Sequence, residues 1–358
     1  MIVDIAIVGL GPAGASAAAI AARSGLSVAG FDRKSSAGHP VQCAEFIPAM
    51  LDAGELAISS SSVQKIDEMI TYVEGSGPDL TKNFSGHMID RQMFDASLVQ
   101  IAEEAGAKCH FGASAKALDD RGRLILSTGE RVAAKIILGA DGPRSIIGAA
   151  VGSENEQIIE TRQVSVELLS PHFATDIYLS NAFPGGYGWM FPKGKIANIG
   201  IGVEAGERPR LRAALDALVE QIAATGQVGR KVLGYTGGPI PAGGLIQPTG
   251  KIGETPIILA GDAAGLANPI TGAGISVAVA TGRLAGEAAA SYLHGGGVGA
   301  LELYAEELED DYGASLRRAV ARRKNLRDWS NKNGALQAAE MRSGWIAYPE
   351  YWHAEQAA

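Results

Sequence analysis

A glycine-rich turn near the N-terminus constrains the fold of this chain more than any other feature. The apolar run at residues 5–8 is typical of a strand buried on both faces. Gly9, Gly11 and Gly14 follow it in the spacing G-x-G-x-x-G, and an alanine-rich helix comes next. In this spacing the first glycine makes the turn, the second lets the backbone approach a pyrophosphate, and the third lets the helix pack against the strand. The stretch therefore predicts a Rossmann-type unit that binds a dinucleotide.

The residues around this turn extend the prediction. Pro12 and Ala13 open the helix, whose unpaired N–H groups and positive dipole end suit phosphate. Asp32 follows the second strand, where a carboxylate accepts a hydrogen bond from a ribose hydroxyl, and we expect Arg33 beside it to contact the same cofactor. The motif alone does not separate FAD from NAD, and a purely structural glycine turn is the alternative.

Two further corners of glycine and aspartate follow strand-like runs. The first lies within residues 133–152, and the second opens residues 255–290, where a glycine-rich loop and a helix of small residues come next. A carboxylate at a strand end can accept hydrogen bonds from sugar or ribityl hydroxyls, and the helix start aims N–H groups at an electron-rich edge. The alternative is two ordinary turns of a doubly wound sheet. The cofactor-contacting residues expected here are Asp141, Gly261, Asp262, Gly272, Ala273, Gly274 and Ile275.

The order of the three motifs, G-x-G-x-x-G, G-A-D-G and G-D-A-A-G with a later P-x-x-G-x-G, resembles the FAD-dependent family of p-hydroxybenzoate-hydroxylase type. That family includes aromatic hydroxylases, halogenases and geranylgeranyl reductases, and the resemblance covers roughly residues 1–300. It implies FAD, with Asp32 at the adenosine ribose, Asp262 at the ribityl or pyrophosphate region, and residues 269–275 beside the isoalloxazine. The stretch 89–107 is similar to the family's R-x-x-F-D helix, which implies Arg91 near the FAD. The alternative for Arg91 is a surface arginine at a helix N-terminus.

The segments between the motifs have a different pattern. Residues 60–88 and 156–245 alternate polar and apolar positions, as half-buried strands do, and an amphipathic helix lies within residues 208–226. We therefore expect an α/β protein in which a mixed β-sheet substrate domain (60–88 and 156–245) is interleaved with a Rossmann-type FAD-binding domain. The FAD-binding domain is expected to comprise residues 1–59, 89–155 and 246–300. Residues 301–358 are expected to form a helical C-terminal segment.

The stretch FPGGYGWMFPKG at residues 183–194 concentrates aromatics on a glycine-rich turn. Tyr187, Trp189 and Phe191 recur with period two, which places them on one face of a strand. Together with Pro184 they match the P-x-x-Y-x-W-x-F pattern of the geranylgeranyl reductase branch, which implies a substrate-facing wall next to the flavin. Packing in an interdomain core is the alternative.

Cys43 is the candidate catalytic residue. Cys43, Ala44 and Glu45 resemble the Cys-Gly-Glu-like turn of the same branch, although Ala44 departs from the usual glycine. A thiol beside a flavin can donate a proton or form an adduct. The alternative is a small, semi-buried hydrophobic residue. Glu45 and His39 are the nearest other ionisable candidates, and Cys109 reads as a residue in the core of a strand.

Composition excludes several classes of partner. A formal charge of −8 argues against nucleic acid and against simple electrostatic docking on anionic lipid. Two cysteines cannot form a disulfide framework or a metal cluster, so we expect no metal site and a cytoplasmic protein. The sequence contains no run of eighteen uninterrupted apolar residues, so we expect no integral membrane segment. A peripheral contact with a membrane remains compatible with the sequence.

The sequence thus indicates an FAD-dependent oxidoreductase. The favoured activity is hydride transfer from reduced flavin to a C=C bond of an apolar, prenyl-like substrate. A monooxygenase that hydroxylates an aromatic ring, including a side chain of a protein substrate, is the alternative, and a flavin-binding accessory factor is a third interpretation. The electron donor is expected to be NAD(P)H or a redox protein. The chain lacks a second G-x-G-x-x-G motif for a separate nicotinamide site.

Overall fold

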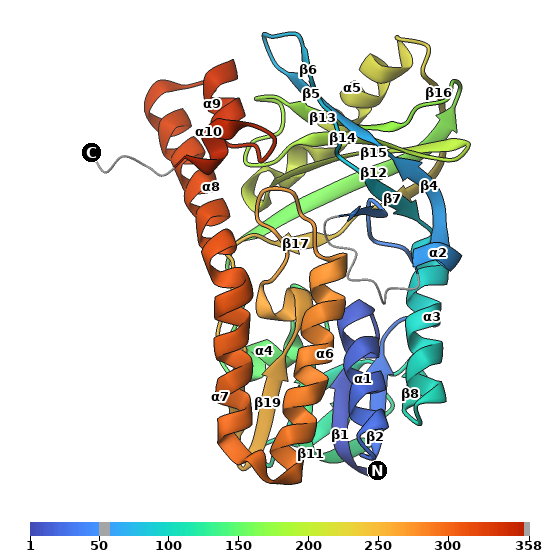
Figure 1. The fold of residues 1–358 in the computed structure, drawn as a ribbon, viewed down its shortest axis with the longest axis vertical. Coiled ribbons are helices and arrows are strands. Elements are labelled where there is room, and N and C mark those ends of the chain that lie inside the picture. The colour runs from blue at the N-terminus through green and yellow to red at the C-terminus, as the bar shows by residue number, and fades with distance from the viewer. Residues whose placement is uncertain (50–57, 354–358) are drawn as a thin grey trace.

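The computed structural model describes residues 1–49 and 58–353 and shows two main sheets, one above the other in Figure 1. Residues 50–57 of the expected FAD-binding domain and residues 354–358 of the expected C-terminal segment lie outside this description. A column of C-terminal helices runs along one side of both layers in Figure 1. This arrangement confirms the expected α/β class with a mixed second sheet and a helical C-terminus.

The lower sheet is built around the N-terminal strand. Its main path has the order β18-β19-β11-β1-β2-β8, and β1 pairs in parallel with both β2 and β11. Side chains of β1 from Ile5 to Val8 are buried, as a strand covered on both faces requires. The strands are β1 (Ile2–Val8), β2 (Val28–Asp32), β8 (Lys108–Phe111), β11 (Arg131–Gly139), β18 (Thr249–Ile252) and β19 (Thr255–Leu259), with β9 (Ala115–Leu118) and β10 (Leu124–Leu126) attached through β11.

Helices of small residues pack closely beside this sheet. On α6 (Ile275–Ser291), Gly282 and Gly286 face α1 (Pro12–Arg23), and a Cβ added at Gly282 would lie 2.2 Å from the carbonyl oxygen of Ala13. Only glycine allows this approach of two backbones. The other helices of the layer are α3 (Arg91–Glu104) and the short α4 (Ile146–Ala150).

The upper sheet has the order β16-β12-β15-β14-β13-β5-β6, with β17 paired to β12. The pair β13–β5 is parallel and the other pairs are antiparallel, so the sheet is mixed. One face packs on α5 (Leu211–Ala223), which buries Leu211, Leu215, Leu218 and Ile222, the stripe predicted from the sequence. The strands are β5 (Glu68–Val73), β6 (Pro78–Thr81), β12 (Ile158–Leu168), β13 (Ala174–Leu179), β14 (Gly188–Lys193), β15 (Ile196–Glu204), β16 (Val228–Thr236) and β17 (Pro239–Pro241).

A small third sheet, which sequence reasoning did not foresee, lies between the two layers. It pairs β3 (Phe46–Pro48) with β7 (Gly86–Ile89), and β7 with β4 (Ser62–Ile66) next to the single turn of α2 (Ile58–Ser61). Through β3 it joins the segment that carries Cys43 to the start of α3.

The C-terminal helices connect the layers. α7 (Gly297–Leu308) continues through a π-helical turn at Glu309–Gly313 into α8 (Ala314–Asn333), and the column then folds back into α9 (Ala338–Ser343) and α10 (Pro349–Trp352) beside the upper sheet (Figure 1). No helix in the described ranges is both long enough and apolar enough to span a bilayer.

Candidate functional site

The N-terminal glycine turn leaves a gap beside its second glycine. A Cβ added at Gly9 or Gly14 would collide with backbone at 2.2 and 1.8 Å, so both positions are fixed by packing. A Cβ at Gly11 would meet nothing within 4 Å. Gly11 is the N-cap of α1 and offers no side chain to the first N–H groups of the helix. The turn therefore presents donors to open space, as an anion site requires.

Asp32 holds this turn together. Its carboxylate accepts hydrogen bonds from the backbone N–H of Leu10 and of Lys34, both at 2.8 Å, and its side chain is buried. A carboxylate has further lone pairs, so these bonds leave it able to accept another donor. Arg33 is exposed at the end of β2.

Asp141 caps a helix. Its carboxylate accepts the Ser145 hydroxyl at 2.5 Å and the backbone N–H of Ile146 at 2.7 Å, at the start of α4. Burial raises the pKa of Asp141, and these hydrogen bonds partly offset that effect. The Asp141 carboxylate is thus already engaged in capping α4, so a hydrogen bond to a cofactor sugar would compete with these bonds.

Asp262 is different, because nothing in the described chain hydrogen-bonds to its carboxylate. Burial raises the pKa of Asp262 to about 6, and the charge of Arg91 partly opposes the shift. One of its oxygens lies 3.2 Å from the position of a Cβ added at Gly274, the N-cap of α6, which also carries no side-chain cap. A desolvated, unpaired carboxylate at an uncapped helix start fits a ligand with hydroxyl donors and an anionic or electron-rich edge.

The loop between Asp262 and Gly274 is fixed by Asn268, a residue that sequence reasoning missed. Its side-chain oxygen accepts the backbone N–H of Ile270 at 2.9 Å and of Thr271 at 3.0 Å, and its own N–H donates to the carbonyl of Ala273 at 2.9 Å. The Asn-Pro dipeptide at 268–269 was the available signal, because asparagine side chains form such turns. Gly272 has φ +69°, and a Cβ there would lie 3.0 Å from Ile240. Residues 268–274 thus form a rigid loop before α6.

Arg91 stands at the first turn of α3. Its guanidinium forms a bidentate pair with Asp95, at 2.9 and 3.0 Å, and lies close enough to Cys43 to interact electrostatically with that side chain. Burial acts to lower the pKa of Arg91, but Asp95 and Cys43 outweigh it and the net shift is upward. A fixed positive charge therefore lies between Asp262 and Cys43.

Cys43 begins a strained turn. The backbone N–H of Glu45 donates to the Cys43 sulfur at 3.1 Å, and Glu45 has φ +69°, a left-handed conformation that is uncommon outside glycine. The buried Glu45 carboxylate accepts Lys193 Nζ at 2.8 Å on both oxygens, Asn198 at 3.1 Å and the Arg91 N–H at 3.1 Å. Glu45 thus ties the cysteine turn to α3, β14 and β15.

The three aromatics predicted for one face lie as expected. Trp189 and Phe191 are each 6% exposed in an apolar cluster on the face of the upper sheet opposite α5, and Tyr187 is half-buried beside them. The Tyr187 hydroxyl donates to the Thr271 carbonyl at 2.6 Å, which joins the aromatic strand to the loop before α6. Burial raises the pKa of Tyr187, and the nearby Cys43 adds to the shift.

Trp345, to which sequence reasoning gave no role, completes this wall. It is 3% exposed, its ring centroid lies 4.8 Å from that of Tyr187, and its indole N–H has no partner among the described residues. The segment that carries it is anchored by Arg342 and Tyr348, which both hydrogen-bond to Asp79.

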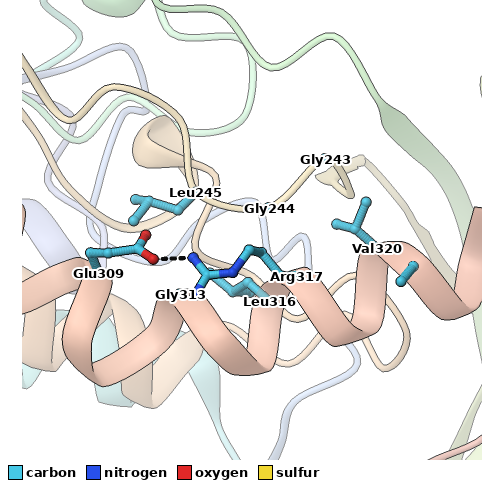
Figure 2. Close-up of a pocket in the computed structure, with 9 residues that line it drawn as sticks. Gly243, Gly244, Leu245, Glu309, Gly313, Leu316, Arg317 and Val320 are labelled. Atoms are coloured by element: carbon cyan, nitrogen blue, oxygen red, sulfur yellow. Dashed lines mark hydrogen bonds and ion pairs between the residues drawn. The ribbon is translucent and has the colours of Figure 1, made fainter. Parts of the chain in front are cut away.

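The structure therefore brings Asp262, Arg91, Cys43 and Tyr187 close to one another. His39 is exposed. Cys109 lies on β8, where burial raises the pKa of its thiol to about 11. A separate hollow of about 330 Å³ lies between residues 243–245 and the start of α8. Figure 2 shows the residues that line it, with Arg317 paired to Glu309. None of the residues predicted for the site lines that hollow.

Comparison with known sequences finds relatives along nearly the whole chain. A family model described as the geranylgeranyl reductase catalytic domain matches residues 157–238. Two Methanopyrus kandleri proteins named digeranylgeranylglycerophospholipid reductase 2 and 1 are 33% and 34% identical to this chain. The first alignment covers 92% of this chain and 88% of the relative, and the second covers 86% of each.

Solved structures share the fold. A geranylgeranyl bacteriochlorophyll reductase-like protein from Thermoplasma acidophilum has a TM-score of 0.80 at 24% identity, over 98% of this chain and 97% of that one. A probable FAD-dependent monooxygenase from Pseudomonas aeruginosa, PqsL, has a TM-score of 0.69 at 18% identity, over 92% and 97%. At these sequence identities the structural similarity shows only a shared fold, and one fold can support more than one reaction.

Proposed function

This chain belongs to the geranylgeranyl reductase family of FAD-dependent oxidoreductases, and on that premise we propose that it reduces C=C bonds in the prenyl chain of a lipid. One observation carries the proposal: the buried Asp262 carboxylate lies close to Arg91, and Arg91 and the apolar aromatic face around Tyr187 both lie close to Cys43. The names of the Methanopyrus kandleri relatives support the substrate class.

The proposed cofactor cradle, formed by the residues around Gly11 and Asp262, fits FAD. Gly11 leaves room for a pyrophosphate at the uncapped start of α1, and Asp262 offers an unpaired carboxylate at the uncapped start of α6. Asp32 keeps capacity to accept a ribose hydroxyl, and the rigid loop 268–274 suits the edge of a flavin ring. We propose that Gly9, Gly14 and Asp141 act by shaping the cradle.

Reduction of an alkene adds a hydride to one carbon and a proton to the other. FAD, when bound and reduced, supplies the hydride. We propose that the Cys43 thiol holds the proton. The Arg91 guanidinium and the Glu45 N–H, 3.1 Å from the sulfur, stabilise the thiolate left after proton transfer. Cys43 is partly exposed, so water can return the proton.

The aromatic wall is proposed to hold the prenyl chain. Tyr187 and its neighbours Trp189 and Phe191 present rigid apolar area at low entropic cost and exclude water from the junction with Cys43. The hydrogen bond from Tyr187 to Thr271 keeps this wall against the loop before α6.

A lipid substrate implies contact with a membrane surface, and we propose a peripheral contact. Val63, Leu169 and Phe173 are 45%, 55% and 60% exposed and line a hollow of about 390 Å³ that also includes Lys195. Exposed apolar side chains beside a lysine suit a headgroup boundary. For the electron donor we propose NAD(P)H or a redox protein.

The test uses the full chain loaded with FAD, reduced with dithionite under anaerobic conditions, and given a digeranylgeranylglycerophospholipid. Mass spectrometry should show a gain of two hydrogens per reduced double bond. Cys43→Ser should lower kcat by about 10²-fold or more, as expected for loss of a general acid. Cys109→Ser, at a cysteine on β8, is the matched control and should leave kcat unchanged.

Two results would contradict the proposal. A product that gains an oxygen atom only in air indicates the monooxygenase alternative. A purified chain that is colourless and binds no added FAD rejects both activities.

A further inference from the structure

A buried arginine outside the three glycine motifs joins the two halves of the site. Arg323 lies on α8, and only 12% of its side chain is exposed. In sequence it sits in an arginine-rich stretch that is typical of a solvated helix face. Its burial therefore has to be explained by what its guanidinium contacts.

One nitrogen of the Arg323 guanidinium donates hydrogen bonds to two segments that are far apart in the sequence. Its Nη1 donates to the carbonyl oxygen of Gly185 and, at 3.3 Å, to the carbonyl oxygen of Pro269. Gly185 belongs to the turn that leads into the aromatic wall, and Pro269 belongs to the loop before α6. The guanidinium therefore bridges the proposed substrate wall and the proposed flavin loop. The hydrogen bond from Tyr187 to Thr271 is a second bridge between the same segments.

A carboxylate holds the bridge in place. Glu204, at the end of β15, lies 3.6 Å from Nη2 of Arg323, and its backbone N–H donates to the carbonyl of Pro184 at 3.0 Å. Gly185 has φ +69°, and a Cβ there would lie 2.2 Å from Cγ of Glu204. The turn, the glutamate and the arginine therefore pack closely against one another.

The arrangement is poorly suited to stability alone. Burial lowers the pKa of Arg323, Glu204 raises it, and the neighbouring Arg327 lowers it further. The Nε of Arg323 has no hydrogen-bond partner within the described residues. A charge that is buried with an incomplete set of partners contributes little net stability.

We propose that Arg323 is a positioning residue that fixes the aromatic turn 184–187 against the loop 268–274 and so sets the gap in which the alkene meets the flavin ring. What occupies that gap rests on the function proposed above. The bridge itself rests only on the contacts of Arg323.

Arg327 provides a matched control. It lies one helical turn further along α8, and its Nη1 is 4.0 Å from the same carboxylate of Glu204. Its side chain is 48% exposed, and no hydrogen bond links it to either segment in the described structure. Arg323→Met and Arg327→Met thus remove the same charge, but only the first removes the bridge.

The experiment compares Arg323→Met, Arg323→Lys and Arg327→Met in the full chain. Visible circular dichroism of bound FAD reports the surroundings of the ring, and steady-state kinetics report kcat and KM for the prenyl lipid. Arg323→Met should change the circular dichroism and lower kcat by about 10- to 100-fold, because a small displacement of reacting groups has this effect. Arg323→Lys should lie in between, since an ammonium reaches carbonyls as a point charge. Arg327→Met should stay within about twofold of the wild type.

The proposal is overturned if folded Arg323→Met matches Arg327→Met in both kcat and flavin spectrum. Should Arg323→Met not fold, the lysine variant decides, and a wild-type spectrum and kcat in that variant overturn the proposal. If the wild type reduces no prenyl lipid, the proposed function fails, while the dichroism comparison still tests the bridge.

Discussion

The buried pair of Glu45 and Lys193 allows a stability prediction with a defined size. The side chains are 8% and 14% exposed, and the ammonium lies 2.8 Å from each carboxylate oxygen. In Lys193→Met the Glu45 carboxylate keeps the Asn198 amide and the Arg91 backbone N–H as donors, both at 3.1 Å, but has no ion-pair partner among the described residues. Removal of one partner from a buried ion pair typically costs about 3–5 kcal/mol. We expect a loss near the lower end, because two hydrogen bonds remain.

The assay is urea unfolding of the FAD-free chain, followed by circular dichroism. Glu45→Gln combined with Lys193→Met should recover most of the loss, because a buried charge is then no longer left alone. A coupling of at least about 2 kcal/mol between the two substitutions is expected.

Lys65→Met is the matched control for this prediction. Lys65 pairs with Asp67 at 3.2 Å, but the two side chains are 66% and 56% exposed, so we expect a change below about 1 kcal/mol. The reasoning is refuted if Lys193→Met costs no more than Lys65→Met, or if adding Glu45→Gln brings no recovery. Either result means that water screens the Glu45 pair as it screens a surface pair.

Three further substitutions, two of them with a matched control, test separate parts of the proposed site. Gly11→Ala should change apo stability by no more than about 1 kcal/mol, because a Cβ meets nothing within 4 Å and only the N-cap preference is lost, yet should weaken FAD binding at least about 100-fold in a fluorescence titration. Gly14→Ala should instead destabilise the fold, because its Cβ would collide with backbone. Since burial raises the pKa of Asp262 to about 6 from 3.8, the FAD-free fold holds a proton that the unfolded chain releases, so stability should fall as pH rises from about 4 through 6. Asp262→Asn should remove this pH dependence of the free energy of unfolding, which amounts to at most about 3 kcal/mol. If the variant shows the same pH dependence as the wild type, the raised pKa does not belong to Asp262. Trp345→Ala should cost about 3–5 kcal/mol in thermal unfolding, whereas Trp352→Ala, at a side chain 56% exposed, should cost less than about 1 kcal/mol; equal losses would show that Trp345 is not a packed part of the wall.

The sequence alone was sufficient to predict those features that depend on the spacing of nearby residues. The glycines at 9, 11 and 14 have fixed places relative to β1 and α1, so a motif predicts both the turn and the open position at Gly11. The shared face of Tyr187, Trp189 and Phe191 was predictable for the same reason, because side chains alternate along a strand whatever it packs against. The family that these motifs indicated is confirmed by relatives such as the Methanopyrus kandleri reductases.

Contacts between segments that are distant in the chain could not be predicted from local sequence patterns in this way. Arg323 and Arg327 occupy the same arginine-rich stretch, and only the packing of α8 on the turn at Gly185 makes one buried and the other exposed. The left-handed conformation of Glu45 is likewise imposed by partners on three other elements. A non-glycine residue in such a conformation cannot be read from its own neighbours in the sequence.

The C-terminal helices pack onto the aromatic face of the upper sheet and are therefore part of the proposed site. The apolar face that carries Trp189 also contains Met341 and Trp345, so without residues 336–348 a large aromatic surface would face water. A monomer rarely exposes such a surface, and the hydrophobic effect therefore draws this segment onto the upper sheet. The hydrogen bonds from Arg342 and Tyr348 to Asp79 then fix its register, while Arg323 reaches from α8 to both carbonyls of the bridge. The motif-bearing part of the chain thus supplies the proposed cradle and the aromatic face, and the segment beyond it covers that face.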